Sequence, residues 1–184
     1  DGTLQYCAGV LVGSITLLGG SSAKYAAIEN CHVSGQVDSK MYAGGLIGAA
    51  SYGKISNCSA DTIVTGNTVS GGFTGYAFSS SFENNTAKGS VTSTGWSTGG
   101  FAGWVYEGAI TKCTASGNVK ADNWNLGGFA GYLSGATVNA CTAYGDVTGT
   151  ATTFIAKAGG FVGTNKGSMI QNSHATGAVS YTHL

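Results

Sequence analysis

The sequence predicts an all-β fold, a β-helix or β-solenoid of about six stacked coils with roughly 28 residues in each coil. Three observations support this fold class. A Gly-Gly signature recurs at intervals of 27, 28, 28 and 32 residues, a second signature follows each copy at a fixed distance, and the 184 residues include 32 Gly and no Pro. A repeat array of this kind builds its core between neighbouring coils.

The first signature, Gly-Gly-(Leu/Phe)-x-Gly, begins one strand of each coil. Its intact copies occupy 44–48, 71–75, 99–103, 127–131 and 159–163, and a worn copy occupies 9–13. The Leu or Phe starts an inward column of large side chains. Glycine suits tight turns and close backbone approach, because it has no Cβ.

The second signature, (Ile/Val/Phe)-x-Asn-Cys-x-Ala-x-Gly-x-Val, predicts a half-buried strand. Its copies begin at Ile28, Ile55, Phe82, Ile110, Val138 and Ile170. After the Asn, small apolar and polar residues alternate for eight positions, which is the period of a strand. We therefore expect two strands per coil, with a short third strand in the segment of variable length.

Composition excludes some partners. Charged residues make up 9% of the chain, the formal net charge is zero and all eight basic residues are Lys. With no basic patch to neutralise phosphates, nucleic acid is not an expected partner. The longest apolar run, 10–18, is interrupted by polar residues and is too short to cross a bilayer, so no membrane insertion is expected.

Cysteine and histidine do not indicate a metal site. Cys31, Cys58, Cys113 and Cys141 share one inward column, and their wide spacing fits no zinc pattern. We expect buried free thiols, because parallel Cβ directions in a stacked column oppose a disulfide. His32 and His174 share a column but lie five coils apart. No metal, cofactor or catalytic residue is predicted, since no nucleotide-binding or hydrolase motif is visible, and the chain is not expected to be an enzyme.

The two signatures together resemble the GLUG repeat family, which occurs in large secreted and surface-attached bacterial proteins. These include adhesin-like proteins and non-catalytic parts of some immunoglobulin A peptidases. The resemblance covers about residues 8–179 and implies an extracellular or cell-surface location. The departures from the pattern, which we expect to weaken individual ladders, are Val10 in place of the second Gly, Asn85 and Ser173 in place of Cys, Lys112 and Ala140 in place of Asn, and Thr62 in place of Gly.

We interpret 1–179 as a single β-solenoid domain and as a segment of a longer protein, because the chain starts in mid-pattern. Residues 180–184 are interpreted as a tail outside the repeat, since 179–184 resembles a translated sequencing adapter. Uncovered end coils would leave unpaired strand edges. Flanking repeats of the same chain or end-to-end self-association are therefore expected partners.

Aromatic residues are the candidate ligand-binding site. Tyr76, Trp104 and Tyr132 occupy the phase opposite to the buried column on three successive coils, and Phe78 and Tyr106 lie two residues further along. Flat apolar rings with polar tips suit sugars or a protein partner. Alternatively, the variable segments fold over this strand and bury it; they carry the aromatic residues Tyr42, Trp96, Trp124 and Phe154.

The favoured function is a structural or interaction segment of a bacterial extracellular adhesin or surface protein, displaying a surface to a host or bacterial glycan or protein. The alternative is a carbohydrate-binding module or, behind it, a carbohydrate-active enzyme that uses Glu83 and Glu107. Glu29 and Glu83 share a column but are separated by a coil, about 10 Å, which exceeds the usual separation of a glycosidase pair.

Overall fold

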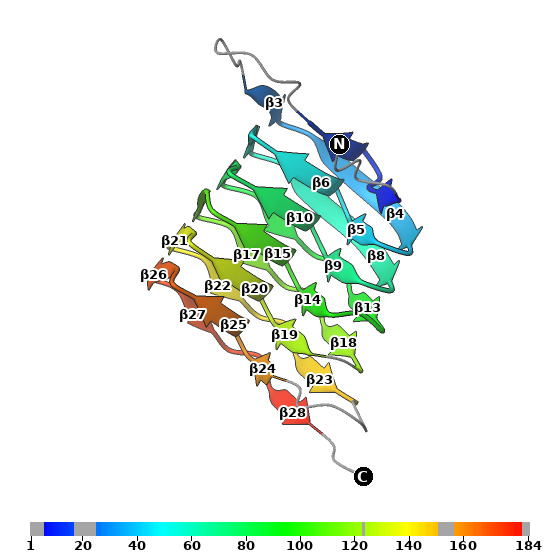
Figure 1. Ribbon diagram of the computed structural model, residues 1–184, viewed down its shortest axis with the longest axis vertical. Helices are drawn as coiled ribbons and strands as arrows, with labels where there is room; N and C mark the ends of the chain where they lie inside the picture. The colour runs from blue at the N-terminus through cyan, green and yellow to red at the C-terminus, as the bar shows by residue number, and fades with distance from the viewer. Residues whose placement is uncertain (1–5, 17–24, 123, 151–156, 182–184) are drawn as a thin grey trace.

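The computed structural model describes residues 6–16, 25–122, 124–150 and 157–181 as one β-solenoid whose coils stack along the long axis (Figure 1). The described residues form strands and turns without a helix, so the predicted fold class is confirmed. Three of the four sheets contain six strands, one from each coil, separated by five turns of about 28 residues. The coils are numbered 1 to 6 and occupy 7–39, 42–66, 69–93, 97–121, 125–149 and 157–181.

Each coil contributes to four sheets, here named A to D in chain order. Sheet A contains β1 (Cys7–Ala8), β5 (Tyr42–Gly44), β9 (Val69–Gly71), β14 (Ser97–Gly99), β19 (Asn125–Gly127) and β24 (Lys157–Gly159). Sheet B contains β2 (Val12–Ile15), β6 (Ile47–Ser51), β10 (Thr74–Phe78), β15 (Ala102–Tyr106), β20 (Ala130–Ser134) and β25 (Val162–Lys166). Sheet C contains β3 (Ala26–Glu29), β7 (Gly53–Ser56), β11 (Ser81–Glu83), β16 (Ala109–Thr111), β21 (Thr137–Asn139) and β26 (Met169–Gln171).

Sheet D is continuous in the first two coils and broken in the other four. The continuous strands are β4 (His32–Ser39) and β8 (Ser59–Gly66). The broken strands are β12 (Thr86–Ala87) with β13 (Val91–Ser93), β17 (Thr114–Ala115) with β18 (Val119–Ala121), β22 (Thr142–Ala143) with β23 (Val147–Gly149), and β27 (His174–Ala175) with β28 (Val179–Tyr181). Coils therefore have four or five strands, more than the two and a short third that the sequence predicted.

All neighbouring strands pair in parallel, and like residues stack on like. The column of the first signature pairs Gly71 with Gly99 and Gly99 with Gly127. The last strand, β28, includes Ser180 and Tyr181, which pair with Thr148 and Gly149 of the previous coil. Residues 182–184 lie outside the described part of the chain.

The Gly-Gly signature makes the turn between sheets A and B, where backbones approach too closely for a side chain. A Cβ on Gly71 would overlap the carbonyl oxygen of Thr74 in the same turn. A Cβ on Gly72 would overlap the carbonyl oxygen of Gly100 in the next coil, and a Cβ on Gly75 would lie 2.7 Å from the oxygen of Gly48 in the previous coil. Gly71, Gly72 and Gly75 of this copy are thus fixed by backbone contacts.

Two further turns use left-handed backbone conformations. In the turn between sheets B and C, Tyr52 and Glu107 have φ of 56° and 59°. The Asn column of the second signature forms the turn between sheets C and D, where Asn57 and Asn84 have φ of 53° and 52°. Asn tolerates this region better than most residues. Lys112 and Ala140, the two departures in this column, adopt the same conformation with φ of 54° each.

The core between the sheets is built around a stack of phenylalanine rings. Phe73, Phe101, Phe129 and Phe161 follow one another with ring centroids 4.8–5.0 Å apart and interplanar angles of 0–7°. Phe82 of sheet C packs edge-on against two of these rings. This is the inward column of large side chains that the first signature predicted.

The Cys column, which consists of Cys31, Cys58, Asn85, Cys113, Cys141 and Ser173, links the coils through side-chain hydrogen bonds. The backbone N–H of Cys113 donates to Sγ of Cys141 at 3.4 Å, and Sγ of Cys113 accepts the N–H of Asn85 at 3.4 Å. The Cys113 thiol also donates to the carbonyl of Thr111 at 3.3 Å. The four cysteines of the column are free thiols, and burial raises the pKa of Cys113 well above its ordinary value.

Asn85 and Ser173 preserve this column rather than weaken it. Oδ1 of Asn85 accepts the N–H of Cys58 at 2.8 Å, and Oγ of Ser173 accepts the N–H of Cys141 at 3.0 Å. The expectation that these two departures weaken the ladder was wrong. The position requires a side-chain acceptor, and oxygen serves this purpose as well as sulfur.

Thr62 lies in β8, one of the two continuous strands of sheet D; the other, β4, has Gly35 in the same column. The residues that align with Thr62 in later coils include Gly89 and Gly117, and the strand is interrupted there. A Cβ on Gly89 would overlap the carbonyl oxygen of Thr62, and a Cβ on Gly117 would overlap that of Gly89.

In the described residues no helix is long and apolar enough to cross a membrane.

Candidate functional site

The predicted ligand-binding residues lie together on the outer face of sheet B. Tyr76 pairs in register with Trp104, and Trp104 with Tyr132. Their ring centroids are 6.1 Å and 5.2 Å apart, and Tyr42 of sheet A extends the row with its ring 5.3 Å from Tyr76. We call these four residues the inner row; its three members on sheet B are half-buried.

An outer row lies two residues further along the same strands. Phe78 stacks on Tyr106 with centroids 5.5 Å apart and an interplanar angle of 14°, and Tyr52 meets Phe78 edge-on at 5.2 Å. Tyr52 and Tyr106 are each 40% exposed. The inner and outer rows together form a surface here named the aromatic ridge. The prediction that sheet B brings these rings together is supported by their register and contacts.

Polar groups of the inner row are partly withdrawn from water. Nε1 of Trp104 is buried and has no hydrogen-bond partner among the described residues. Burial, followed by the nearby phenols of Tyr42 and Tyr106, raises the pKa of Tyr76. The outer row is therefore the more accessible part of the ridge, although the stacked rings of Phe78 and Tyr106 cover part of each other's faces.

Trp96 and Trp124, the tryptophans of the variable segments, lie directly before strands of sheet A and not on the strands of sheet B. Trp96 and Trp124 stack on each other between sheets D and A, with centroids 6.1 Å apart, and are 60% and 47% exposed. Nδ2 of Asn125 donates to the carbonyl of Trp96 at 3.1 Å. Of the four covering candidates, Tyr42 belongs to the inner row through its contact with Tyr76, and Phe154 lies outside the described residues.

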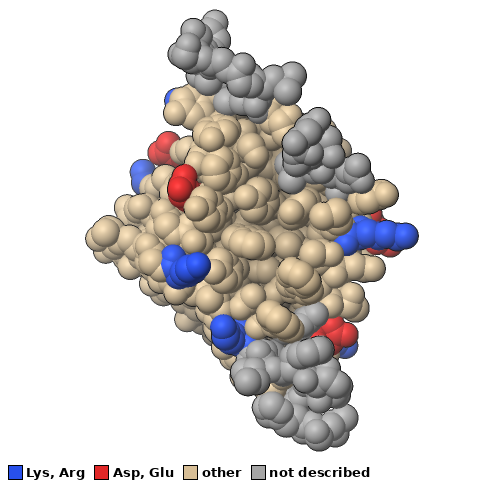
Figure 2. Space-filling model, in the orientation of Figure 1, with Lys and Arg blue, Asp and Glu red and all other residues tan. Residues whose placement is uncertain are grey.

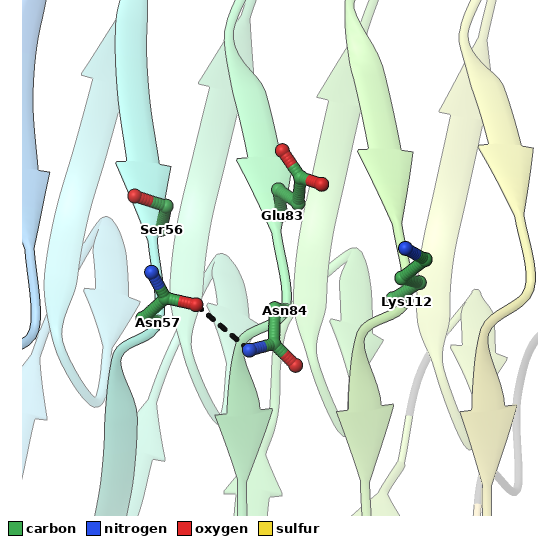
Figure 3. Close-up of a pocket in the computed structure, with 5 residues that line it drawn as sticks. All are labelled: Ser56, Asn57, Glu83, Asn84 and Lys112. Carbon is green, nitrogen blue, oxygen red and sulfur yellow. Dashed lines mark hydrogen bonds between the residues drawn. The ribbon is translucent and has the colours of Figure 1, made fainter.

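A polar groove of about 430 Å³ lies at the turn between sheets C and D. Figure 3 shows its lining residues Ser56, Asn57, Glu83, Asn84 and Lys112, which come from three successive coils. Nδ2 of Asn84 donates to Oδ1 of Asn57 at 2.7 Å. The groove offers amide, hydroxyl, carboxylate and ammonium groups, which can exchange hydrogen bonds with a hydroxyl-rich or peptide ligand. The sequence pattern indicated Glu83 only as an acid and did not predict this groove.

The carboxylates proposed for the enzyme alternative are placed on different turns. Glu83 ends β11 before the turn between sheets C and D, whereas Glu107 follows β15 in the turn between sheets B and C. Glu107 accepts a hydrogen bond from Oγ of Ser79 at 2.9 Å. Glu29 and Glu83 share a column with Ser56 between them, as predicted.

Charges are sparse on the visible surface, and Figure 2 shows basic and acidic side chains as isolated groups on a largely uncharged face. Among the described residues no three His, Cys, Asp or Glu side chains cluster in a way that could hold a metal ion. His32 is engaged with Oγ of Ser59 through Nδ1 at 2.8 Å, and the ring of His174 meets that of Tyr144 edge-on.

Comparison with known proteins identifies the repeat. Four segments, 40–65, 94–120, 122–148 and 158–180, match the family model described as the GLUG motif, and together they cover more than half of the chain. Coil 3 lies outside these matches but has the same succession of strands as coil 4. A comparison with curated proteins finds no match.

Among solved structures, the chain is similar to a crystal structure from Bacteroides ovatus described as a "putative immunoglobulin A1 protease". The two are 17% identical with a TM-score of 0.49, and the alignment covers 85% of this chain and 60% of the other. The chain therefore spans less than two thirds of the length of that structure.

Proposed function

The chain belongs to the GLUG-motif family, and we propose that it is a repeat module of a bacterial extracellular or cell-surface protein that displays a binding surface. The observation that supports this proposal best is the aromatic ridge, where rings from successive coils share one outer face. Exposed aromatic groups gathered on one face are typical of surfaces that contact a sugar or another protein. An adhesin is the kind of protein that uses such a module.

Rigid stacking is the physical basis of display. The hydrogen bonds between coils hold the side chains of each column at the strand spacing of about 4.8 Å. A ligand that extends along the stack, such as a glycan chain or an extended peptide, can then make the same contact with several coils. The protein loses little conformational entropy on binding, because its surface is formed before the ligand binds.

Carbohydrate binding is the second candidate, and the polar groove favours it. The groove combines Glu83, Lys112 and the paired amides of Asn57 and Asn84 on an outer edge of the stack. These groups can donate to and accept from sugar hydroxyls. In this proposal the module binds without catalysis, because Glu83 and Glu107 occupy different turns rather than flanking one bond.

The proposal is tested by binding to a glycan array and to immobilised surface proteins. The variant Phe78→Ala/Tyr106→Ala removes the outer row, and Tyr76→Ala/Trp104→Ala/Tyr132→Ala removes the inner row on sheet B. We expect at least a tenfold loss of affinity from the outer-row variant, which alters partly exposed side chains and should remain folded.

The matched control is Trp96→Ala/Trp124→Ala, which removes two exposed aromatic rings that lie between sheets D and A rather than on the strands of sheet B. Equal losses from the control and the outer-row variant would contradict a specific role for the ridge. Binding that survives both ridge variants but is lost in Glu83→Gln/Lys112→Met would assign the ligand to the polar groove.

A further inference from the structure

The turn between sheets B and C lies beside the outer row of the aromatic ridge and repeats one strained backbone conformation. Tyr52, Ser79 and Glu107 follow the last residues of β6, β10 and β15, so they form one column along the stack, here named the corner column. Their φ angles are 56°, 44° and 59°. Residues with a side chain rarely adopt this left-handed conformation, because their Cβ then lies too close to the following carbonyl oxygen.

Glycine takes the same position in coils 5 and 6. Gly135 and Gly167 follow the last residues of β20 and β25, with φ of 64° and 69°. Glycine has no Cβ and adopts this conformation without strain. The fold therefore does not require a side chain at this turn, yet coils 2–4, which carry the outer row, all have one. Backbone strain that the fold does not require is a reason to look for a function of the side chains.

Glu107 is the charged member of the corner column and directly follows Tyr106 of the outer row. Its side chain is exposed, and Oε2 accepts a hydrogen bond from Oγ of Ser79 at 2.9 Å, which orients the carboxylate along the column. An ionised carboxylate has about four acceptor sites on its two oxygens. The bond from Ser79 therefore leaves Glu107 able to accept hydrogen bonds from a ligand that lies on the neighbouring ring.

Gly135 leaves room beside this carboxylate. Among the described residues, a Cβ on Gly135 would meet one atom within 4 Å, Cγ of Glu107 at 3.6 Å. The surface next to Glu107 is thus uncovered on the side of coil 5. A ligand can approach the carboxylate and the ring of Tyr106 from this side.

The extent of the outer row indicates a small ligand. The row crosses coils 2–4, which are two steps of about 4.8 Å, or roughly 10 Å in all. A stable protein interface takes about 800 Å² from each partner. The outer row offers parts of three rings, with Tyr52 and Tyr106 each 40% exposed. A sugar unit, which has an apolar face and hydroxyl groups around its edge, matches an exposed ring beside a hydrogen-bond acceptor.

We propose that the outer row and Glu107 bind a neutral sugar unit of a glycan. The apolar face of the sugar lies on Tyr106, and two of its hydroxyl groups donate to the Glu107 carboxylate. This inference rests on the proposed display function of the ridge and names the class of its ligand. Acidic sugars are disfavoured, because their carboxylate would be repelled by that of Glu107.

The first experiment measures binding of the full 184-residue chain to an array of neutral oligosaccharides of glucose, galactose, mannose and N-acetylglucosamine. Sialylated and uronic-acid oligosaccharides on the same array provide the comparison. We expect neutral oligosaccharides to bind at least tenfold more tightly than acidic ones. A preference for acidic oligosaccharides, or binding to none of the neutral ones, would overturn the inference.

Glu107→Gly separates the side chain from the turn that it occupies. Because glycine relieves the strained φ, this variant should unfold at a temperature about 2–4 °C higher than the parent. It should bind the neutral oligosaccharide at least tenfold more weakly. Ala140→Gly is the matched control, since Ala140 is an exposed residue with φ of 54° in the turn between sheets C and D. It should gain the same thermal stability and keep the affinity of the parent.

Two further variants test the contact itself. Glu107→Gln keeps the shape of the side chain without its charge and should reduce the preference for neutral over acidic oligosaccharides. Lys112→Gly relieves a φ of 54° in the lining of the polar groove and should leave the affinity unchanged. Loss of the neutral oligosaccharide in Lys112→Gly but not in Glu107→Gly would assign the sugar to the groove and overturn the inference.

The outer-row variant Phe78→Ala/Tyr106→Ala distinguishes this inference from the display function on which it rests. A glycan or immobilised surface protein that is lost by the outer-row variant and retained by Glu107→Gly would overturn the sugar assignment and leave the display function standing. If the outer-row variant loses no ligand at all, the display function fails and the inference fails with it.

Discussion

Coil 4 and coil 6 have the same sequence pattern and the same strands but different environments. Ile110 and Val119 of coil 4 are 0% and 1% exposed, whereas Ile170 and Val179 of coil 6 are 36% and 47% exposed. Coil 4 has a neighbour on both sides, and coil 6 has one within the chain. The repeat pattern therefore does not decide burial by itself, and the stabilising free energy resides in the interfaces between coils.

Substitution of glycine should give the largest difference in the free energy of unfolding between variants of the two coils. A Cβ on Gly100 would overlap the carbonyl oxygen of Gly128, while a Cβ on the equivalent Gly160 would meet the side chains of Ala175 and Val179 at ordinary contact distances of 3.4 Å and 3.5 Å. We expect Gly100→Ala to lower the free energy of unfolding by more than about 3 kcal/mol, the upper end of typical overpacking. Gly160→Ala should change it by less than about 0.5 kcal/mol. Urea unfolding of the monomer measures both, and similar losses would contradict the comparison.

Phenylalanine truncation is the next contrast. Phe101 stacks between Phe73 and Phe129 and is fully buried, whereas Phe161 stacks on Phe129 alone among the described residues and is partly exposed. Phe101→Ala should cost about 3–5 kcal/mol. Phe161→Ala should cost roughly half as much, because fewer atoms lose contacts. Thermal and urea unfolding check the ratio, and equal costs would show that the end coil is as well packed as the interior.

The Cys column separates hydrogen bonding from packing. Cys113→Ala leaves the buried N–H of Asn85 without its acceptor and should cost about 1–3 kcal/mol. Cys113→Ser retains an acceptor and should recover much of that loss. In coil 6, Ser173→Ala removes the equivalent acceptor from Cys141 beside a partly exposed residue and should cost less. Equal stabilities of the Ala and Ser variants at position 113 would argue against this role.

The smallest expected effect is a pH dependence of the free energy of unfolding, which arises from a buried thiol in an interior coil. Burial raises the pKa of Cys113, while an unfolded thiol has a pKa of about 8.5. Below that pH both states hold the proton. Above it the unfolded chain loses the proton first, so the free energy of unfolding falls as pH rises, by up to about 1.4 kcal/mol per pH unit for one thiol.

Cys113→Ser is the control for this dependence, because serine does not titrate in the range. Its stability should fall less steeply than that of the parent above about pH 8.5, with both proteins kept reduced. Parallel curves would mean that Cys113 contributes nothing to the alkaline loss.

Columns were predictable from sequence because stacked coils repeat the same environment. Gly-Gly turns, the Asn position and the phase of Phe101 and Trp104 all follow from spacing. The role of Asn85 did not follow, because one sequence position does not show that a side-chain acceptor is needed by the coil before it. The number of strands was underestimated for a similar reason: the left-handed turn at Glu107 divides what reads as continuous chain.

The sequence predicted which residues form the candidate site but not how exposed their side chains are. Register alone places Tyr76, Trp104 and Tyr132 side by side. Burial of Nε1 of Trp104 depends on rings and backbone from other segments, which spacing does not describe. The stacking of Trp96 on Trp124 had a signal in the sequence, since Ser97 and Asn125, the residues after them, occupy equivalent positions of neighbouring coils.

The hydrogen bonds that join the coils run along the long axis of the stack, and this has a mechanical consequence. A force that pulls the two ends of the stack apart acts parallel to these hydrogen bonds. The coils should therefore separate one at a time rather than all together. Each event would release about 28 residues, or roughly 95 Å of extended chain. Such a segment would lengthen in steps under tension and limit the force passed to whatever it holds.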